Sequence, residues 1–232
     1  MAISSDTDSS GKLFAQDKAF WNNYLKGRPT VPKSFFDRIY RYHEEHGGQF
    51  GTVHDVGAGI GPYARELRSK FQHVIVSDII PKNVKFAKDR LGTDGFSYRA
   101  AKVEEAHDIP MGSVDLVFAT NVLHFTDQKK AIEAIAKQLR PGGTFAAAGF
   151  GPALFSDTDL QDVWVRINQQ GGRVILKTVD KPQELINVME RSGGYYNVAP
   201  LDVNFFLPGA KRIHLNQEER RFPMSLATGG FR

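Results

Sequence analysis

Three glycines at alternate positions, followed by an aspartate, mark the part of the sequence best suited to hold a ligand. Gly57, Gly59 and Gly61 come directly after a short apolar run. This pattern predicts a strand that turns tightly into a helix, where a side chain would collide with whatever lies against the backbone. Asp78 ends the next apolar run, and a carboxylate there can accept both hydroxyls of a ribose. The stretch therefore predicts a nucleoside-binding turn.

The residues around this turn separate two classes of nucleoside ligand. The dinucleotide fingerprint has a third glycine three residues after the second, but Pro62 stands three residues after Gly59. An NAD-linked oxidoreductase is therefore the less favoured alternative. Asp55 adds a carboxylate that would repel a pyrophosphate but suits the ammonium and sulfonium cations of S-adenosylmethionine. The charges favour the methyl donor.

The glycine turn, with Asp55 before it and Asp78 after it, resembles motif I and the acidic second-strand end of class I S-adenosylmethionine-dependent methyltransferases. Residues 113–117 and 139–143 also resemble this family, so the match runs from about residue 21 to about residue 150. The resemblance implies an α/β, Rossmann-like methyltransferase fold: a mostly parallel sheet with helices on both faces. It also implies S-adenosylmethionine as the cofactor. The alternative is a glycine turn that only lets a helix pack closely on a strand.

The same resemblance implies a set of cofactor-binding residues. Ile79 follows the ribose carboxylate and is expected to form one wall for the adenine, although ordinary packing is an alternative. The loop after the third strand is expected to contact the adenine, but Lys102 stands where a small or acidic residue is more usual. The cofactor residues are Asp55, Gly57, Ala58, Gly59, Gly61, Asp78, Ile79, Val103, Glu104 and Asn121.

The end of the fourth predicted strand, 114–120, points to the reaction site. Parallel strands end at one edge of the sheet, and open sheets bind ligands there, so Asn121 and His124 are expected to face the site. A hydroxyl acceptor would profit from His124 as a general base, whereas a carboxylate acceptor needs none. The alternative is that His124 only shapes the pocket. No pair of side chains has metal-ligand spacing, so we predict no metal.

An aromatic-rich helical segment precedes the glycine turn. The Arg28-Pro29-x-x-Pro32 element and the helix after it resemble the corresponding segment of trans-aconitate methyltransferase-like proteins, especially fungal ones. In that group the leading helix helps to close the cofactor pocket. Trp21, Tyr24 and Arg28 are therefore candidate lid residues. The alternative is that the aromatic stripe belongs to the core, which is the commoner role of such a pattern.

The length of 232 residues predicts a single domain. We expect residues 1–12 to be a disordered leader and 13–232 to be one methyltransferase domain. Its expected parts are an N-terminal helical lid (13–50), the cofactor-binding core (51–150), substrate-covering helices and the last strands (151–216), and a tail (217–232). Gly171 and Gly172 are expected to stop a helix that begins near residue 157, and the last two strands are expected at 195–199 and 203–207.

Composition narrows the partners. The net charge of +4 does not demand a nucleic acid, and cysteine is absent, so no disulfide or thiolate site can form. Enzymes that methylate exocyclic amines of bases typically follow the fourth strand with two prolines and an aromatic residue, but Val122 and Leu123 stand here. We predict a small-molecule partner, no nucleic acid and no membrane. With neither a secretory signal nor a membrane span, the cytoplasm is the simplest location. The oligomeric state is not indicated.

The predicted function is transfer of a methyl group to a small organic acceptor. In-line displacement mainly requires that the protein align the nucleophile and exclude water. The family neighbourhood suggests the carboxylate or hydroxyl of a small acid or a secondary metabolite. The alternative is a protein that binds S-adenosylmethionine without transferring its methyl, either as a partner subunit or as a catalyst of an uncharged rearrangement.

Overall fold

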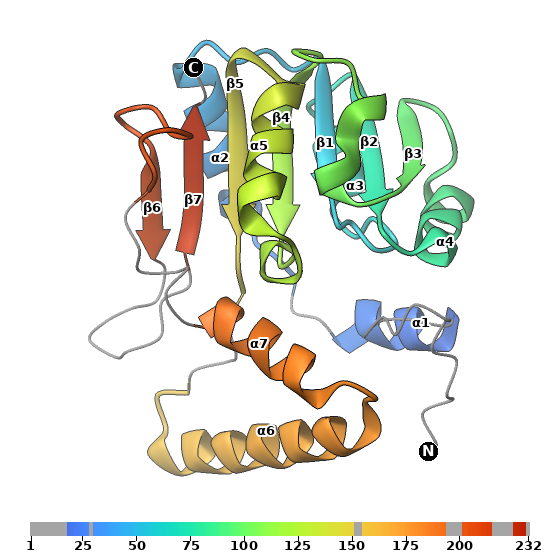
Figure 1. The fold of residues 1–232 in the computed structure, drawn as a ribbon, viewed down its shortest axis with the longest axis vertical. Coiled ribbons are helices and arrows are strands. Elements are labelled where there is room, and N and C mark those ends of the chain that lie inside the picture. Colours follow the sequence, from blue (N-terminus) through green and yellow to red (C-terminus); the bar gives the residue numbers. More distant parts are fainter. Residues whose placement is uncertain (1–17, 28–29, 151–154, 194–200, 215–224, 231–232) are drawn as a thin grey trace.

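The computed structural model describes residues 18–27, 30–150, 155–193, 201–214 and 225–230. Within them lies a seven-stranded sheet with the order β3-β2-β1-β4-β5-β7-β6 (Figure 1). The strands β1 to β5 pair in parallel, whereas β7 runs antiparallel to both β5 and β6. The strands are β1 (Thr52–Val56), β2 (His73–Asp78), β3 (Phe96–Ala100), β4 (Val114–Thr120), β5 (Leu139–Ala148), β6 (Lys211–His214) and β7 (Ser225–Gly230). The prediction of a mostly parallel, Rossmann-like sheet is confirmed.

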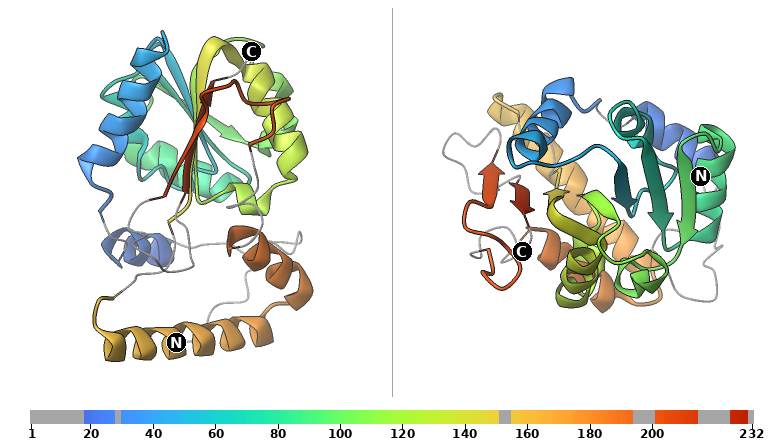
Figure 2. Two further views of the ribbon diagram at one scale, coloured as in Figure 1. Left: turned by 90° about the vertical axis from the view of Figure 1, so that its left-hand side faces the viewer. Right: turned by 90° about the horizontal axis from the view of Figure 1, so that it is seen from above.

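Helices cover both faces of the sheet (Figure 2). The helices α2, α3 and α4 contribute to one core cluster, and η1 and α5 to the other. The α-helices are α1 (Lys18–Gly27), α2 (Lys33–Glu45), α3 (Ala64–Arg68), α4 (Pro81–Leu91), α5 (Gln128–Gln138), α6 (Thr158–Thr178) and α7 (Pro182–Gly193). The 3₁₀ helices are η1 (Val103–Asp108) and η2 (Leu123–Phe125). No helix among the described residues is both long enough and apolar enough to cross a membrane.

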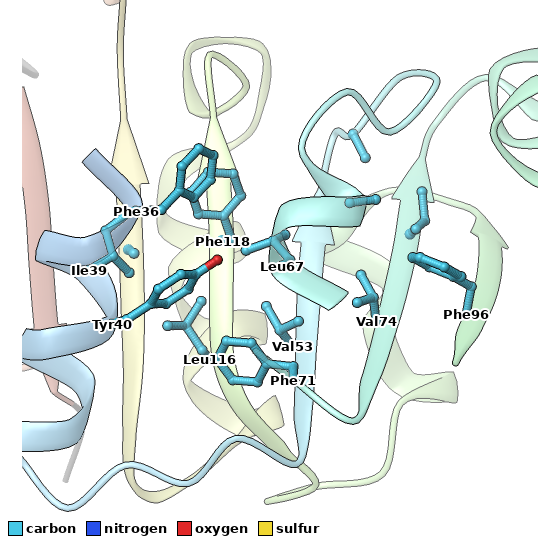
Figure 3. Packing of buried hydrophobic residues seen from close by; sticks show 14 of the residues in the cluster. Phe36, Ile39, Tyr40, Val53, Leu67, Phe71, Val74, Phe96, Leu116 and Phe118 are labelled. Carbon is cyan, nitrogen blue, oxygen red and sulfur yellow. The ribbon is translucent and has the colours of Figure 1, made fainter. Parts of the chain in front are cut away.

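The strand β4 joins the two core clusters because its side chains alternate between the faces. Leu116 and Phe118 pack on the face covered by α2, where Phe36 stacks on Phe118 with ring centroids 6.0 Å apart (Figure 3). Val117 belongs to the opposite cluster, beneath α5. All seven residues of β4 except Thr120 are buried. The continuous apolar run is therefore that of a central parallel strand.

The order in which strands are added to the sheet reverses at β1, and this reversal determines where a ligand can bind. From β1 the chain builds β2 and β3 on one side, then crosses back to build β4 and β5 on the other. The loops after β1 and β4 therefore diverge at the carboxyl ends of the strands, where open α/β sheets bind ligands. In Figure 1, α1, α6 and α7 lie beyond this edge.

The predicted helix stop at Gly171 and Gly172 is wrong. The helix α6 runs on through both glycines to Thr178, so the expected end near residue 170 falls in its interior. A glycine inside a helix costs about 1 kcal/mol relative to alanine, which weakens a helix without ending it. Apolar side chains at 174 and 175 continue the helical pattern beyond the pair.

The last strands also differ from the prediction. Residues 203–207 form turns, and the strand expected at 195–199 lies outside the described residues, as does the expected leader at 1–12. The final strands are β6 and β7, and β7 lies within the expected tail of 217–232. Its sequence of small residues carries little strand signal. Pairing with β5, from Thr144 opposite Gly230 to Ala148 opposite Leu226, makes it a strand.

Candidate cofactor site

Asp55 lies next to the last residue of β1, directly before the glycine turn, and its carboxyl group is buried. Its side chain is 1% exposed, and its Oδ2 atom has no hydrogen-bond partner among the described residues. Burial, and after it the nearby carboxylate of Asp78, raises the pKa of Asp55 to about 8. A buried carboxyl oxygen without a partner is unfavourable. This carboxyl fits a cationic ligand, which would supply the missing partner.

The glycine turn follows Asp55, and its glycines adopt a left-handed conformation. The φ angles are +63° at Gly57, +58° at Gly59 and +68° at Gly61. A Cβ atom on Gly59 would lie 2.7 Å from Cη2 of Trp21, and one on Gly57 would overlap the side chain of Val122. The protein's own side chains therefore require glycine at these two positions, in addition to any need for close approach by a ligand.

Hydrogen bonds fasten the turn to β2. The Ala58 N–H donates to the Ser77 carbonyl oxygen, and the Gly59 N–H donates to Oδ2 of Asp78, both at 2.9 Å. Arg90 of α4 is half-buried. It donates from Nε to the Ile60 carbonyl oxygen at 3.1 Å and from Nη2 to the Gly61 carbonyl oxygen. The sequence pattern did not identify Arg90. Its role in the turn depends on a contact across about thirty residues.

Asp78 is held in one orientation by several donors. In addition to Gly59, the Ile80 N–H donates to Oδ1 at 2.9 Å, and Nδ2 of Asn83 donates to the same atom at 3.3 Å. Asn83 was not predicted as a site residue. Ile79 is 38% exposed beside this carboxylate, so its side chain is accessible to a ligand. The ribose and adenine roles of Asp78 and Ile79 stay predictions.

The helix α1 reaches the turn through its aromatic residues. Trp21 donates from Nε1 to Oδ1 of Asn83 at 2.9 Å, and the far edge of its indole lies against Gly59. Tyr24 packs edge-on against Trp21, with ring centroids 5.2 Å apart. Of the three candidate lid residues, Trp21 thus contacts the turn, and Tyr24 packs on Trp21. Arg28 lies outside the described residues.

Asn121 follows β4 in a left-handed conformation, with φ of +53°. It is the one residue other than glycine with positive φ in the described part of the chain. Its backbone N–H donates to the Ala148 carbonyl oxygen at 2.8 Å, and its Oδ1 accepts from the Phe150 N–H at 2.7 Å. Asparagine tolerates this conformation better than most residues, and strained residues of this kind cluster at functional sites. Asn121 therefore ties the ends of β4 and β5 together.

His124 lies in η2, at the same edge. Burial, with a smaller effect of the Arg191 charge, lowers the pKa of His124 to about 4. Arg191 of α7 donates from Nε to the His124 carbonyl oxygen at 2.9 Å. The imidazole is therefore neutral at physiological pH, and a cation lies beside it. Arg191 was missed by the sequence reasoning because an arginine in a surface helix carries no pattern of its own.

The two residues predicted on the adenine side have structural contacts. Val103 is 5% exposed and packs in the cluster beneath α5. Glu104 accepts a hydrogen bond at Oε1 from the Asp127 N–H, at 2.9 Å, and so joins η1 to the loop before α5. Their contact with adenine stays a prediction. Among the described residues, no three histidine or acidic side chains are grouped so that they could hold a metal.

Comparison with known proteins decides the family. Residues 54–147 match the model of the methyltransferase domain. The chain is 68% identical over 212 residues to methyltransferase tpcM of Aspergillus fumigatus. The matched region covers 91% of this chain and 66% of that protein. The chain is also 63% identical over 218 residues to a methyltransferase of Claviceps purpurea, and this match covers 94% of this chain and 69% of that protein. The chain belongs to the class I S-adenosylmethionine-dependent methyltransferases.

A solved structure supports the methyltransferase fold. A protein of Anaeromyxobacter dehalogenans assigned as a type II methyltransferase superposes with a TM-score of 0.57 at 18% identity, over 88% of this chain and 97% of that one. The chain spans about two thirds of the length of the fungal methyltransferases that it matches, 66% and 69% in the two named above. The narrower resemblance to trans-aconitate methyltransferase-like proteins stays a prediction.

We predict that Asp55→Asn stabilises the cofactor-free methyltransferase and weakens cofactor binding. The pKa of Asp55 is about 8 in the folded protein and 3.8 ordinarily, so the fold favours the protonated carboxyl. Ionisation of Asp55 therefore lowers the stability of the wild type progressively from about pH 4 to pH 8. The variant escapes this loss, so its advantage in urea unfolding is absent below pH 4 and largest above pH 8.

Calorimetric titration with S-adenosylmethionine is expected to show at least about a tenfold loss of affinity in the same variant, because the ammonium loses a buried partner. Asp94→Asn, at an exposed position, is the control and should change neither property. A stability difference, variant minus wild type, that does not rise between pH 4 and pH 8 would contradict the prediction, because it would show that the fold does not favour the protonated carboxyl.

A pair of variants tests the backbone strain at Asn121. Asn121→Gly and Asn121→Ala both remove the hydrogen bond to the Phe150 N–H, but only glycine accepts a φ of +53° without strain. We expect both to be less stable than the wild type in urea unfolding, and the alanine variant to be lower than the glycine variant by about 1 kcal/mol. Equal stability of the two variants would show that the left-handed conformation is absent in solution.

Proposed function

We propose that the chain transfers the methyl group of S-adenosylmethionine to a small organic acceptor, the carboxylate or hydroxyl of a small acid or secondary metabolite, by in-line displacement. The observation that carries this proposal is the buried, unpaired Oδ2 atom of Asp55 beside the glycine turn. Two carboxylates at one strand edge, Asp55 and Asp78, suit a cationic nucleoside and oppose a diphosphate. The names of the fungal relatives support the same reaction.

The cofactor, when bound, supplies a methyl carbon made electrophilic by the sulfonium. The residues of the chain then have distinct roles. Asp55 pairs with the ammonium, and Asp78 accepts the ribose hydroxyls. Gly57 and Gly59 have no side chain that would block close approach of the cofactor to the turn, and Asn121 fixes the end of β4 beside the turn. The remaining proposed cofactor contacts are Ala58, Gly61, Ile79, Val103 and Glu104.

The environment of His124 favours a carboxylate acceptor over a hydroxyl. A group whose pKa is about 4 is a weak base for removing the proton of a hydroxyl at neutral pH. A carboxylate arrives already ionised and needs no base. Arg191, bonded to the backbone of His124, adds a cation that attracts an anionic acceptor to this edge. In this proposal His124 shapes the acceptor pocket and is not the base.

A turnover assay tests the acceptor class. Release of S-adenosylhomocysteine is measured with pairs of small aromatic compounds that differ only in a carboxylate or a hydroxyl. At saturating S-adenosylmethionine, whose ammonium keeps Asp55 ionised, we expect turnover with the acids and a rate that changes little from pH 6 to pH 9, because neither the acceptor nor His124 titrates there. Arg191→Gln should raise KM about tenfold by removing the cation. Lys129→Gln, an exposed cation on α5, is the control.

The same assay distinguishes the alternatives. Turnover with hydroxyl compounds that rises with pH, and falls more than a hundredfold in His124→Gln, would make His124 the general base. Cofactor binding without release of S-adenosylhomocysteine across the whole panel would instead favour a protein that binds the cofactor without transferring its methyl group. The choice of a small molecule over a nucleic acid rests on Val122 and Leu123 after β4.

A further inference from the structure

A chain of hydrogen bonds connects α1 to the carboxylate of Asp78. The indole Nε1 of Trp21 donates to Oδ1 of Asn83 at 2.9 Å, and Nδ2 of Asn83 donates to Oδ1 of Asp78 at 3.3 Å. The second oxygen of Asp78 accepts from the Gly59 N–H, and the indole edge rests against Gly59. Trp21 thus meets the Gly59–Asp78 pair from two sides, through Asn83 and through direct packing.

Asn83 lies between Trp21 and Asp78, and its side-chain amide can bond to both. An indole N–H only donates and an ionised carboxylate only accepts, so the group between Trp21 and Asp78 must accept from one and donate to the other. Asn83 carries a donor and an acceptor on one amide and serves both neighbours. Its side chain is only 2% exposed, so water does not readily replace a lost partner. An aspartate at this position would lose the donor and repel Asp78.

Among the side chains described in α1, those of Trp21 and Tyr24 are half-buried and the rest are exposed. The helix is ten residues long, which is too short to be stable by itself in water. Phe20 and Leu25, two of its apolar residues, are each 39% exposed. Trp21 therefore attaches α1 to the turn both by its hydrogen bond to the buried amide of Asn83 and by its packing on Gly59.

We propose that Asn83 is a positioning residue that latches α1 to the ribose-binding carboxylate, so that docking of α1 and orientation of Asp78 are one equilibrium. A cofactor that bonds Asp78 then binds more tightly when α1 is docked, and the cofactor in turn holds α1 down, because such coupling is reciprocal. The inference rests on cofactor binding by the family and is independent of the acceptor class.

A double-mutant cycle on cofactor affinity tests the latch. Trp21→Phe keeps an aromatic ring on α1 but removes the donor and the far edge of the indole, and Asn83→Ala removes the acceptor. We expect each to weaken binding of S-adenosylhomocysteine about fivefold in calorimetry, and the double variant to lose little more than either alone, because both break one connection. Asn22→Ala, on the exposed side of α1, is the control and should bind normally.

Two outcomes would overturn the latch. Losses that multiply to about twenty-five-fold in the double variant would show that Trp21 and Asn83 act independently. Tighter binding in Trp21→Phe would show that the indole competes with the nucleoside for its place over Gly59. If Asn83→Ala unfolds, comparison of Trp21→Phe with Trp21→Ala decides, because the first is then expected to show most of the loss that the second shows.

Fluorescence of the cofactor-free protein gives a second readout. The chain has two tryptophans, so Trp164→Phe leaves Trp21 as the only tryptophan, and excitation at the red edge of the absorption band selects its emission over that of tyrosine. In this background, Asn83→Ala should shift the emission to longer wavelength and increase quenching by acrylamide, because the indole is released to water. Unchanged emission and quenching would refute the latch. Neither readout uses an acceptor, so a failure of the proposed methyl transfer would leave this test standing.

Discussion

The parallel pairing of β1 with both β2 and β4 decides where the polar residues of the site lie. Val56 aligns with Ser77 on one side and with Ala119 on the other. The residues that follow, Gly57, Asp78 and Asn121, therefore emerge together at one edge of the sheet. The apolar side chains of the three strands pack into the two cores. The residues at the carboxyl ends of the strands are therefore the ones left to form the site. The fold and the site thus come from the same register.

Burial of charge then sets the character of this edge. Asp55 is inside the protein, and its burial, with the nearby carboxylate of Asp78 as the smaller cause, disfavours its ionisation. Perturbed carboxyls of this kind concentrate at binding sites because the arrangement is costly in the empty protein. A cation relieves the cost, which gives the cofactor an electrostatic advantage that a neutral or anionic nucleoside lacks. Affinity here is obtained at the expense of the stability of the empty fold.

Local sequence signals were sufficient for much of this. The apolar runs of β1, β2 and β4 and the glycine turn could all be predicted from neighbouring residues. The same signals gave only part of the reason for the glycines: a ligand was expected against them, yet Val122 and Trp21 already lie there. The contacts with Val122 and Trp21 could not be predicted from the sequence, because each joins residues far apart in the chain.

The failures have the same origin. Asn83, Arg90 and Arg191 make their contacts with the site across long stretches of chain, and one asparagine or arginine in a helix has no pattern to reveal it. The helix α6 passes through a glycine pair that local rules treat as a stop, and β7 is a strand only because the edge of β5 offers it partners. Tertiary context decides at such positions, and local propensity does not.

The place of β7 has a consequence for the order of assembly. It is later in the chain than β6 but lies between β5 and β6, so β6 can join the sheet only after the segment that follows it has been inserted. During synthesis the outer rim of β5 stays bare for the whole time that α6, α7 and β6 are being made. Such a rim is a template for strands of other molecules. Chaperone dependence in newly made protein should therefore be governed by this late insertion rather than by the five parallel strands that come first.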